Sequence, residues 1–191
     1  MRGTAGVERR LDGLVVPEYR CIVADPPWLE RGGGKIKRGA DRHYPLMTWP
    51  EIVGTMLRAE QWRPAPSCHL WLWVTNNYLR DGLRAIDALG FRYVTNIVWV
   101  KDSIGLGQYI RAQHELCLFA VKGDAMMPTT AALGSVLQVA RAAHSQKPQQ
   151  AFDLIEGVSP GPRLEMFARE TRAGWDTWGN ERASTLFGGA A

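Results

Sequence analysis

The sequence predicts an α/β protein whose largely parallel sheet is covered by helices on both faces. Short apolar runs, bounded by turn-forming residues, alternate along the chain with segments of helical periodicity. The apolar runs are rich in β-branched and aromatic residues, which favour strands. Because 191 residues suit one domain, we expect a single domain over residues 1–191, with mobile segments at 1–18 and 183–191.

The first strong strand is expected at the apolar run of residues 21–24, after a short strand near residues 14–16. The run ends abruptly at Asp25, Pro26 and Pro27, and prolines cannot donate to a sheet ladder. Asp25 should therefore stand at the carboxyl end of a buried strand, where open α/β sheets bind their ligands.

The next elements follow from capping residues and breakers. A helix is predicted over residues 48–59, because Thr48-Trp49-Pro50-Glu51 combines a capping box with a proline in the first turn. Residues 61–67 hold two prolines and are expected to form a loop, and the aromatic run at residues 69–74 is expected to form a central strand.

A second helix should be capped by Asn76 or Asn77, carry an apolar stripe of Leu79, Leu83 and Ile86, and end at Gly90. The remaining expected elements are strands at residues 91–101, 115–122, 136–139, 163–168 and 175–178, and a helix that Ser145 caps and Gly157 ends. The strand at 115–122 is expected to be antiparallel, which would make the sheet mixed, and the last strand should lie at an edge.

The four residues Asp25-Pro26-Pro27-Trp28 suit the binding of an aromatic amino group. Asp25 and the Pro26 carbonyl would form a rigid pair of acceptors without a competing donor, because a proline peptide has no N–H and a fixed φ. Such a pair matches the two hydrogens of an exocyclic amino group and stabilises the charge that develops when its nitrogen attacks. Trp28 would offer a flat face for base stacking. A simple turn is the alternative interpretation.

This tetrad resembles the signature of the MT-A70 family of adenine-N6 methyltransferases, which use S-adenosylmethionine. Five further segments follow in the family's order over about residues 20–181: Leu72-Trp73-Val74-Thr75-Asn76, Asn96-Ile97-Val98-Trp99-Val100-Lys101, His144-Ser145-Gln146-Lys147-Pro148, Leu164-Glu165-Met166-Phe167-Ala168-Arg169 and Gly179-Asn180-Glu181. The resemblance implies a Rossmann-like methyltransferase fold with a mixed, mostly parallel sheet. It also implies a permuted motif order, with Asp-Pro-Pro-Trp near the N-terminus.

Residues 29–43 contain four glycines and six basic side chains and are expected to form a surface loop beside Asp25. The loop is predicted to contact nucleic-acid phosphates and to close over the base, the alternative being a solvated loop with incidental charge. The resemblance agrees, because the segment matches a gate loop of the family and is followed by a matching aromatic residue. The expected catalytic residues are Asp25, Pro26, Pro27 and Trp28, and the expected substrate-binding residues are Trp28, Lys35, Lys37, Arg38, His43 and Tyr44.

A second group of residues is predicted to bind the cofactor. Lys147 near a helix start offers an ammonium for a carboxylate, and the resemblance assigns it the carboxylate of the methionine moiety. The resemblance also implies that Asp25 contacts the methionine amine and Arg169 the ribose. The expected cofactor-binding residues are Asp25, Lys147, Phe167, Arg169, Asn180 and Glu181, the last two at the ribose and adenine. Some members carry Gln in place of Glu181 and His-Asn in place of Thr171-Arg172. The role of Glu165 stays open between structure and function.

Composition argues against several classes of protein. Cys21, Cys68 and Cys117 lie far apart in apolar runs, which predicts buried free thiols in a reducing compartment and no metal site. The chain has neither an 18-residue apolar run nor an apolar segment in residues 1–10, so we expect an intracellular, cytoplasmic protein without membrane contact. The net charge of +4 permits a polyanionic partner. No cysteine follows a proline, which excludes covalent cytosine-C5 chemistry.

The predicted function is S-adenosylmethionine-dependent methylation of adenine N6 in nucleic acid, by direct transfer to an unpaired or flipped-out base. DNA is favoured over RNA, because the compact chain resembles prokaryotic and phage members of the family. The alternatives are an RNA adenine-N6 methyltransferase, a cytosine-N4 methyltransferase, and a non-catalytic nucleic-acid-binding scaffold subunit. Association with another copy or another subunit is left open.

Overall fold

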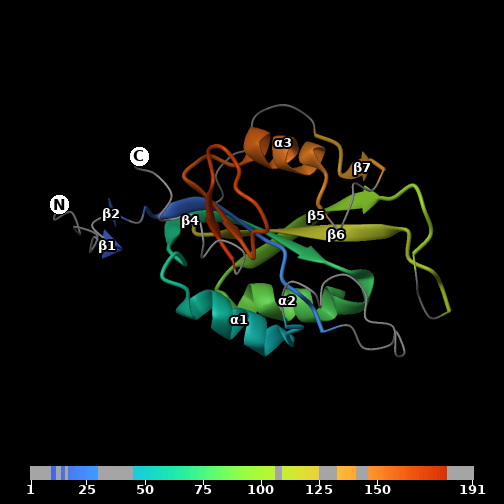
Figure 1. Cartoon of the computed structure of the whole chain (residues 1–191), viewed down its shortest axis with the longest axis horizontal. Helices are drawn as coiled ribbons and strands as arrows, with labels where there is room; N and C mark the ends of the chain where they lie inside the picture. Colours follow the sequence, from blue (N-terminus) through green and yellow to red (C-terminus); the bar gives the residue numbers. More distant parts are fainter. Residues whose placement is uncertain are drawn as a thin grey trace, which may run out of the picture.

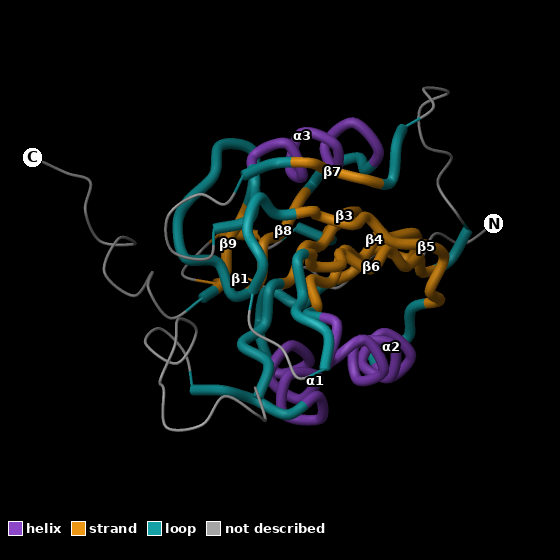
Figure 2. The backbone as a smooth tube through the Cα atoms, turned by 90° about the vertical axis from the view of Figure 1, so that its right-hand side faces the viewer, coloured by secondary structure: helices purple, strands orange, loops and turns teal. Residues whose placement is uncertain are grey.

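The computed structural model describes residues 10–11, 14–15, 17–29, 45–105, 109–124, 133–140 and 146–179. These residues form three layers, with helices α1 and α2 on one face of a sheet and helix α3 on the other (Figures 1 and 2). The arrangement confirms the predicted α/β class with helices on both faces.

The sheet has seven strands in the order β7-β5-β6-β4-β3-β8-β9. Their bounds are Tyr19–Ala24 for β3, Pro64–Val74 for β4, Arg92–Val100 for β5, His114–Lys122 for β6, Val136–Gln138 for β7, Arg163–Met166 for β8 and Asp176–Trp178 for β9. Strand β6 pairs antiparallel with both β4 and β5, and the other described pairings in this sheet are parallel. This mixed, mostly parallel sheet confirms the Rossmann-like expectation. A separate antiparallel pair joins β1, Arg10–Leu11, to β2, Leu14–Val15.

Helix α1 spans Trp49–Arg58 and begins at the predicted capping box. The Thr48 N–H donates to Glu51 Oε2 at 2.7 Å, which satisfies one of the donors left open at the helix start. Strand β4 begins at Pro64, so the loop predicted over residues 61–67 is too long. Pro64 pairs with Tyr19 of the parallel neighbour β3, and the register shifts before His69 pairs with Cys21, a tertiary effect that local composition does not reveal.

Two predicted helix starts are wrong. Asn76 opens a short 3₁₀ turn, Asn76–Tyr78, and helix α2, Leu79–Ala88, follows it with Tyr78 as its N-cap residue. Helix α3, Gln149–Val158, has Pro148 at its N-cap, and the predicted cap Ser145 lies outside the described residues. Gly90 does follow the end of α2, with a φ of 77° that glycine adopts without strain.

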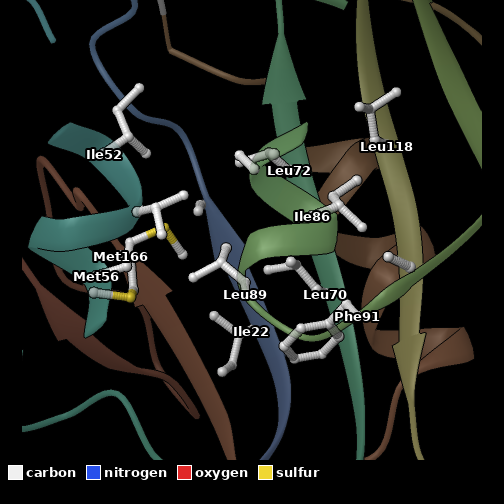
Figure 3. Close-up of a cluster of buried hydrophobic side chains, with 14 of the residues drawn as sticks. Ile22, Ile52, Met56, Leu70, Leu72, Ile86, Leu89, Phe91, Leu118 and Met166 are labelled. Atoms are coloured by element: carbon white, nitrogen blue, oxygen red, sulfur yellow. The ribbon is translucent and has the colours of Figure 1, made fainter. Parts of the chain in front are cut away.

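Alternation along β3 divides the core into two clusters. Ile22 packs toward α1 and α2, together with Leu70 and Leu72 of β4 (Figure 3). Ala24 belongs to the same cluster. The intervening β3 residue Val23 joins the cluster under α3, which includes Trp71, Trp73, Phe152 and Ile155. Burying each large apolar side chain contributes about 1.5–3 kcal/mol. Strand β3 is thus held from both sides, and its carboxyl end has a fixed position.

The three cysteines are buried and free, as predicted. Burial raises the pKa of the Cys21 and Cys68 thiols to about 12, which makes both thiols unreactive at neutral pH. Among the described residues, no helix combines the length and the apolar character that crossing a membrane requires.

Candidate active site

The turn after β3 fixes the backbone of the predicted tetrad. The Asp25 N–H approaches the Met166 carbonyl of β8 at 3.4 Å, and the next two residues, Pro26 and Pro27, are buried. The Trp28 N–H donates to the Pro26 carbonyl at 2.9 Å. The expectation of an acceptor pair without a competing donor is therefore wrong, because the chain's own Trp28 amide occupies one lone pair of that carbonyl. One lone pair of Pro26 and the Asp25 carboxylate remain as acceptors.

Trp28 does not present the open face that the sequence suggested. Its side chain is 5% exposed and stacks on Tyr78, with ring centroids 5.8 Å apart. The indole N–H donates to the Trp73 carbonyl at 2.9 Å. From sequence alone, a tryptophan at a strand end can stack on a base or pack in the core. In this structure Trp28 is a core residue that packs with residues of α1 and α2. Trp28 anchors the turn that carries Asp25.

Asp25 forms an ion pair with Lys147. The Lys147 Nζ lies 2.7 Å from Asp25 Oδ2, and the two side chains are 10% and 24% exposed. Lys147 also lies 3.4 Å from Glu115 Oε2, and Glu115 in turn contacts Lys101. Four side chains of alternating charge thus form a row along one edge of the sheet.

The two inner members of the row, Lys147 and Glu115, favour their charged forms despite burial. Burial disfavours the charged form of Lys147, but the attraction of Asp25 and Glu115 outweighs it and raises the pKa of the ammonium above its usual value. Burial likewise opposes ionisation of Glu115, yet Lys147 and Lys101 together lower the pKa of its carboxyl. Both shifts favour the charged forms of Lys147 and Glu115 at neutral pH.

Sequence reasoning missed Glu115 as a site residue. Because β6 runs against the other strands, its first residues lie at the same edge as the carboxyl ends of β3, β4 and β5. Glu115 therefore reaches Lys147 from the start of a strand, whereas Asp25 and Lys101 reach the site from strand ends. The usable signal was the expected antiparallel pairing, which brings the end of β5 beside the start of β6.

A pocket opens beside this row, between the ends of β3 and β8 and the start of α3. The pocket is open to solvent. Its lining brings together four of the predicted cofactor-binding residues: Asp25, Lys147, Phe167 and Arg169. Phe167 is 3% exposed and has a φ of 62°, a left-handed conformation that is uncommon for a bulky residue and turns the chain out of β8.

Glu165 also lines the pocket, which settles the direction of its side chain. The neighbours Leu164 and Met166 point into the core under α1 and α2, so strand alternation turns Glu165 to the opposite face. Burial raises the pKa of its carboxyl to about 7, and Arg172, whose Nε lies 3.9 Å from Glu165 Oε2, opposes that effect only in part.

The remaining predicted site residues lie outside the described part of the chain, so their positions stay predictions. These are Lys35, Lys37, Arg38, His43 and Tyr44 for the substrate, and Asn180 and Glu181 for the cofactor.

A mixed sheet with one reversed strand, and a charged pocket at the carboxyl ends of its parallel strands, define a Rossmann-like methyltransferase. The MT-A70 family model matches residues 19–181 of this chain, and the chain belongs to that family.

Individual relatives agree with this assignment. The chain is 30% identical to the type II methyltransferase M.MunI from a Mycoplasma species, over 86% of this chain and 78% of that protein. It is 27% identical to the human N(6)-adenosine-methyltransferase catalytic subunit METTL3, over 91% of this chain but 30% of that protein. A similar relative from Medicago truncatula, a putative N(6)-adenosine-methyltransferase, is 28% identical over 27% of its own length. The chain thus spans less than a third of these two plant and animal relatives.

Proposed function

We propose that this adenine-N6 methyltransferase acts on DNA, with S-adenosylmethionine as methyl donor and Asp25 as the acceptor for the target amino group. Adenine-N6 methyltransferase activity follows from membership in the MT-A70 family and from the relatives. The observation that carries the residue assignment is the Asp25–Lys147 pair at 2.7 Å on the wall of the pocket.

The chemistry of the pocket lining fits the cofactor. Its methionine moiety carries a carboxylate for Lys147 and an ammonium for Asp25, so each half of the ion pair has a matching group on the ligand. Arg169 supplies donors for the ribose, and Phe167 supplies apolar surface. When bound, the cofactor supplies an electrophilic methyl group.

The chain's own groups bind the adenine amino group and stabilise its charge during transfer. The Asp25 carboxylate accepts a hydrogen bond from the adenine amino group and stabilises the positive charge that its nitrogen develops as it attacks. The Pro26 carbonyl has one lone pair left for the second amino hydrogen. Glu115 gives Lys147 a second acidic partner at 3.4 Å, so the ammonium stays paired while Asp25 binds a substrate group. The target base has to leave the helical stack to reach Asp25.

The share of each relative that this chain matches supports DNA as the substrate. The chain matches most of a type II methyltransferase, whereas it matches less than a third of METTL3 and its plant counterpart.

Methyl transfer from labelled S-adenosylmethionine tests the proposal. Purified protein should label adenine-containing DNA oligonucleotides, single-stranded or duplex, and should label RNA of the same sequence more slowly. Asp25→Ala should abolish labelling, whereas Asp87→Ala, which changes an exposed carboxylate on α2, should not. Faster labelling of RNA would overturn the DNA assignment, and labelling confined to cytosine would overturn the base assignment.

The scaffold alternative predicts a different result. A non-catalytic subunit without a cofactor should show no rise in melting temperature with S-adenosylmethionine, whereas a cofactor-binding protein gains stability by mass action.

A further inference from the structure

Glu165 occupies an unusual place for a carboxylate. It lies in β8 between two strands, opposite Val23 of β3 on one side and Thr177 of β9 on the other. Its side chain is only 14% exposed, and that exposure is to the pocket it shares with Asp25 and Lys147.

The charges that face Glu165 leave it incompletely paired. Arg172 lies 3.9 Å away, beyond hydrogen-bond distance, and its guanidinium is placed over the Phe152 ring at 3.6 Å. Asp25 and Glu170 add repulsion, and Lys147 adds a weaker attraction. Arg169 is the other cation on the pocket lining.

The other two acids of the pocket are less suited to sense an added positive charge. Asp25 is neutralised by an ammonium at 2.7 Å. Glu170 is exposed to solvent, which screens its charge, and it accepts a hydrogen bond from Gln146 at 2.7 Å. Glu165 combines burial with a loose partner, so its interaction with a ligand charge is screened least.

The methyl donor and its product differ in this respect. S-adenosylmethionine carries a sulfonium cation, whereas S-adenosylhomocysteine has a neutral thioether, and the adenine, ribose, ammonium and carboxylate are common to both. We propose that Glu165 recognises the positive charge of the methyl donor and thereby makes the pocket bind donor in preference to product. The inference rests on the proposed cofactor.

A consequence follows for proton exchange. Since burial and the neighbouring acids raise the pKa of Glu165 to about 7, the carboxyl is partly protonated at neutral pH. A bound cation favours the ionised form, so binding the donor should release a proton and weaken as the pH falls, whereas binding the product should do so much less.

Isothermal titration calorimetry of the full chain tests this without turnover. From pH 7.5 to pH 5.5 the affinity for S-adenosylmethionine should fall about tenfold, and that for S-adenosylhomocysteine about twofold or less. In buffers of different ionisation enthalpy, donor binding at pH 7 should release about half a proton. Sinefungin, which carries an amine where the donor has its methyl sulfonium, should follow the donor.

The variant Glu165→Gln assigns the effect to this residue. It should weaken donor binding about tenfold at pH 7.5, leave product binding within about twofold and remove the pH dependence of donor binding. Glu60→Gln, an exposed change in the turn after α1, should retain the wild-type profile. If wild-type protein binds donor and product with the same pH profile, the inference fails and the proposed function stands. If wild-type protein binds neither ligand, the proposed cofactor fails.

Discussion

The Lys147 ammonium lies 2.7 Å from a carboxylate oxygen of Asp25, although 122 residues separate the two in sequence. The pair joins the turn after β3 to the segment that leads into α3, so it ties both walls of the pocket together. Its partners in the substrate complex are predicted to be the amino acid groups of the cofactor.

Replacing Lys147 should therefore affect both stability and ligand binding. Lys147→Met leaves Asp25 and Glu115 without their shared cation, and we expect the free energy of unfolding to fall by about 3 kcal/mol. Affinity for S-adenosylmethionine should fall at least about tenfold, since a charge-assisted contact is lost. Urea unfolding and calorimetry measure the two effects. Lys147→Arg, which retains the charge, should lose less of each, and equal affinity in Lys147→Met would contradict the carboxylate assignment.

Glu165 should make the protein less stable as the pH rises. Its pKa is raised from 4.5 to about 7, so between these values the folded protein retains a proton that the unfolded chain releases. The contribution of this group to the free energy of unfolding is fully present below pH 4.5 and is lost as the pH rises through 7. Glu165→Gln removes the dependence, and at pH 8 it should be more stable than wild type by about 2 kcal/mol. Urea unfolding at pH 5 and pH 8 measures the difference, and a variant less stable than wild type at pH 8 would refute it.

Substitutions at Trp28 test whether its buried indole anchors the turn or serves as a stacking surface for the target base. Trp28→Phe keeps a ring against Tyr78 but removes the donor to the Trp73 carbonyl, and should cost about 1 kcal/mol of stability. Trp28→Ala should cost about 3–5 kcal/mol. Because the indole does not face the pocket, Trp28→Phe should retain methylation per folded molecule within a few-fold. A loss of a hundredfold or more in a well-folded Trp28→Phe protein would restore the base-stacking role.

The contact between Lys101 and Glu115 should show energetic coupling. Glu115→Gln leaves Lys101 partly buried without its acid and should lower stability, as should Lys101→Met. The double variant removes both charges, and we expect it to be more stable than the sum of the two single changes predicts, by about 0.5–3 kcal/mol. Chemical denaturation of the four proteins measures the coupling, and strict additivity would show that the contact contributes nothing.

Local chemistry was sufficient to predict some features and not others. Two prolines after an apolar run place Asp25 at a strand end, and a capping box places the start of α1, because both signals are confined to a few residues. The start of β4, the burial of Trp28 and the contact of Glu115 with Lys147 depend on neighbouring strands and helices. The site residues on strand ends were therefore predictable from local sequence, whereas Glu115, at the start of the reversed strand, could be found only from the pairing of β5 with β6.

The reversed direction of β6 also shapes how the protein can diverge. Strand β5 ends at the site and strand β6 begins there. The connection between Lys101 and His114 therefore begins and ends beside the pocket. Its length and composition can change while the paired strands behind it keep their register.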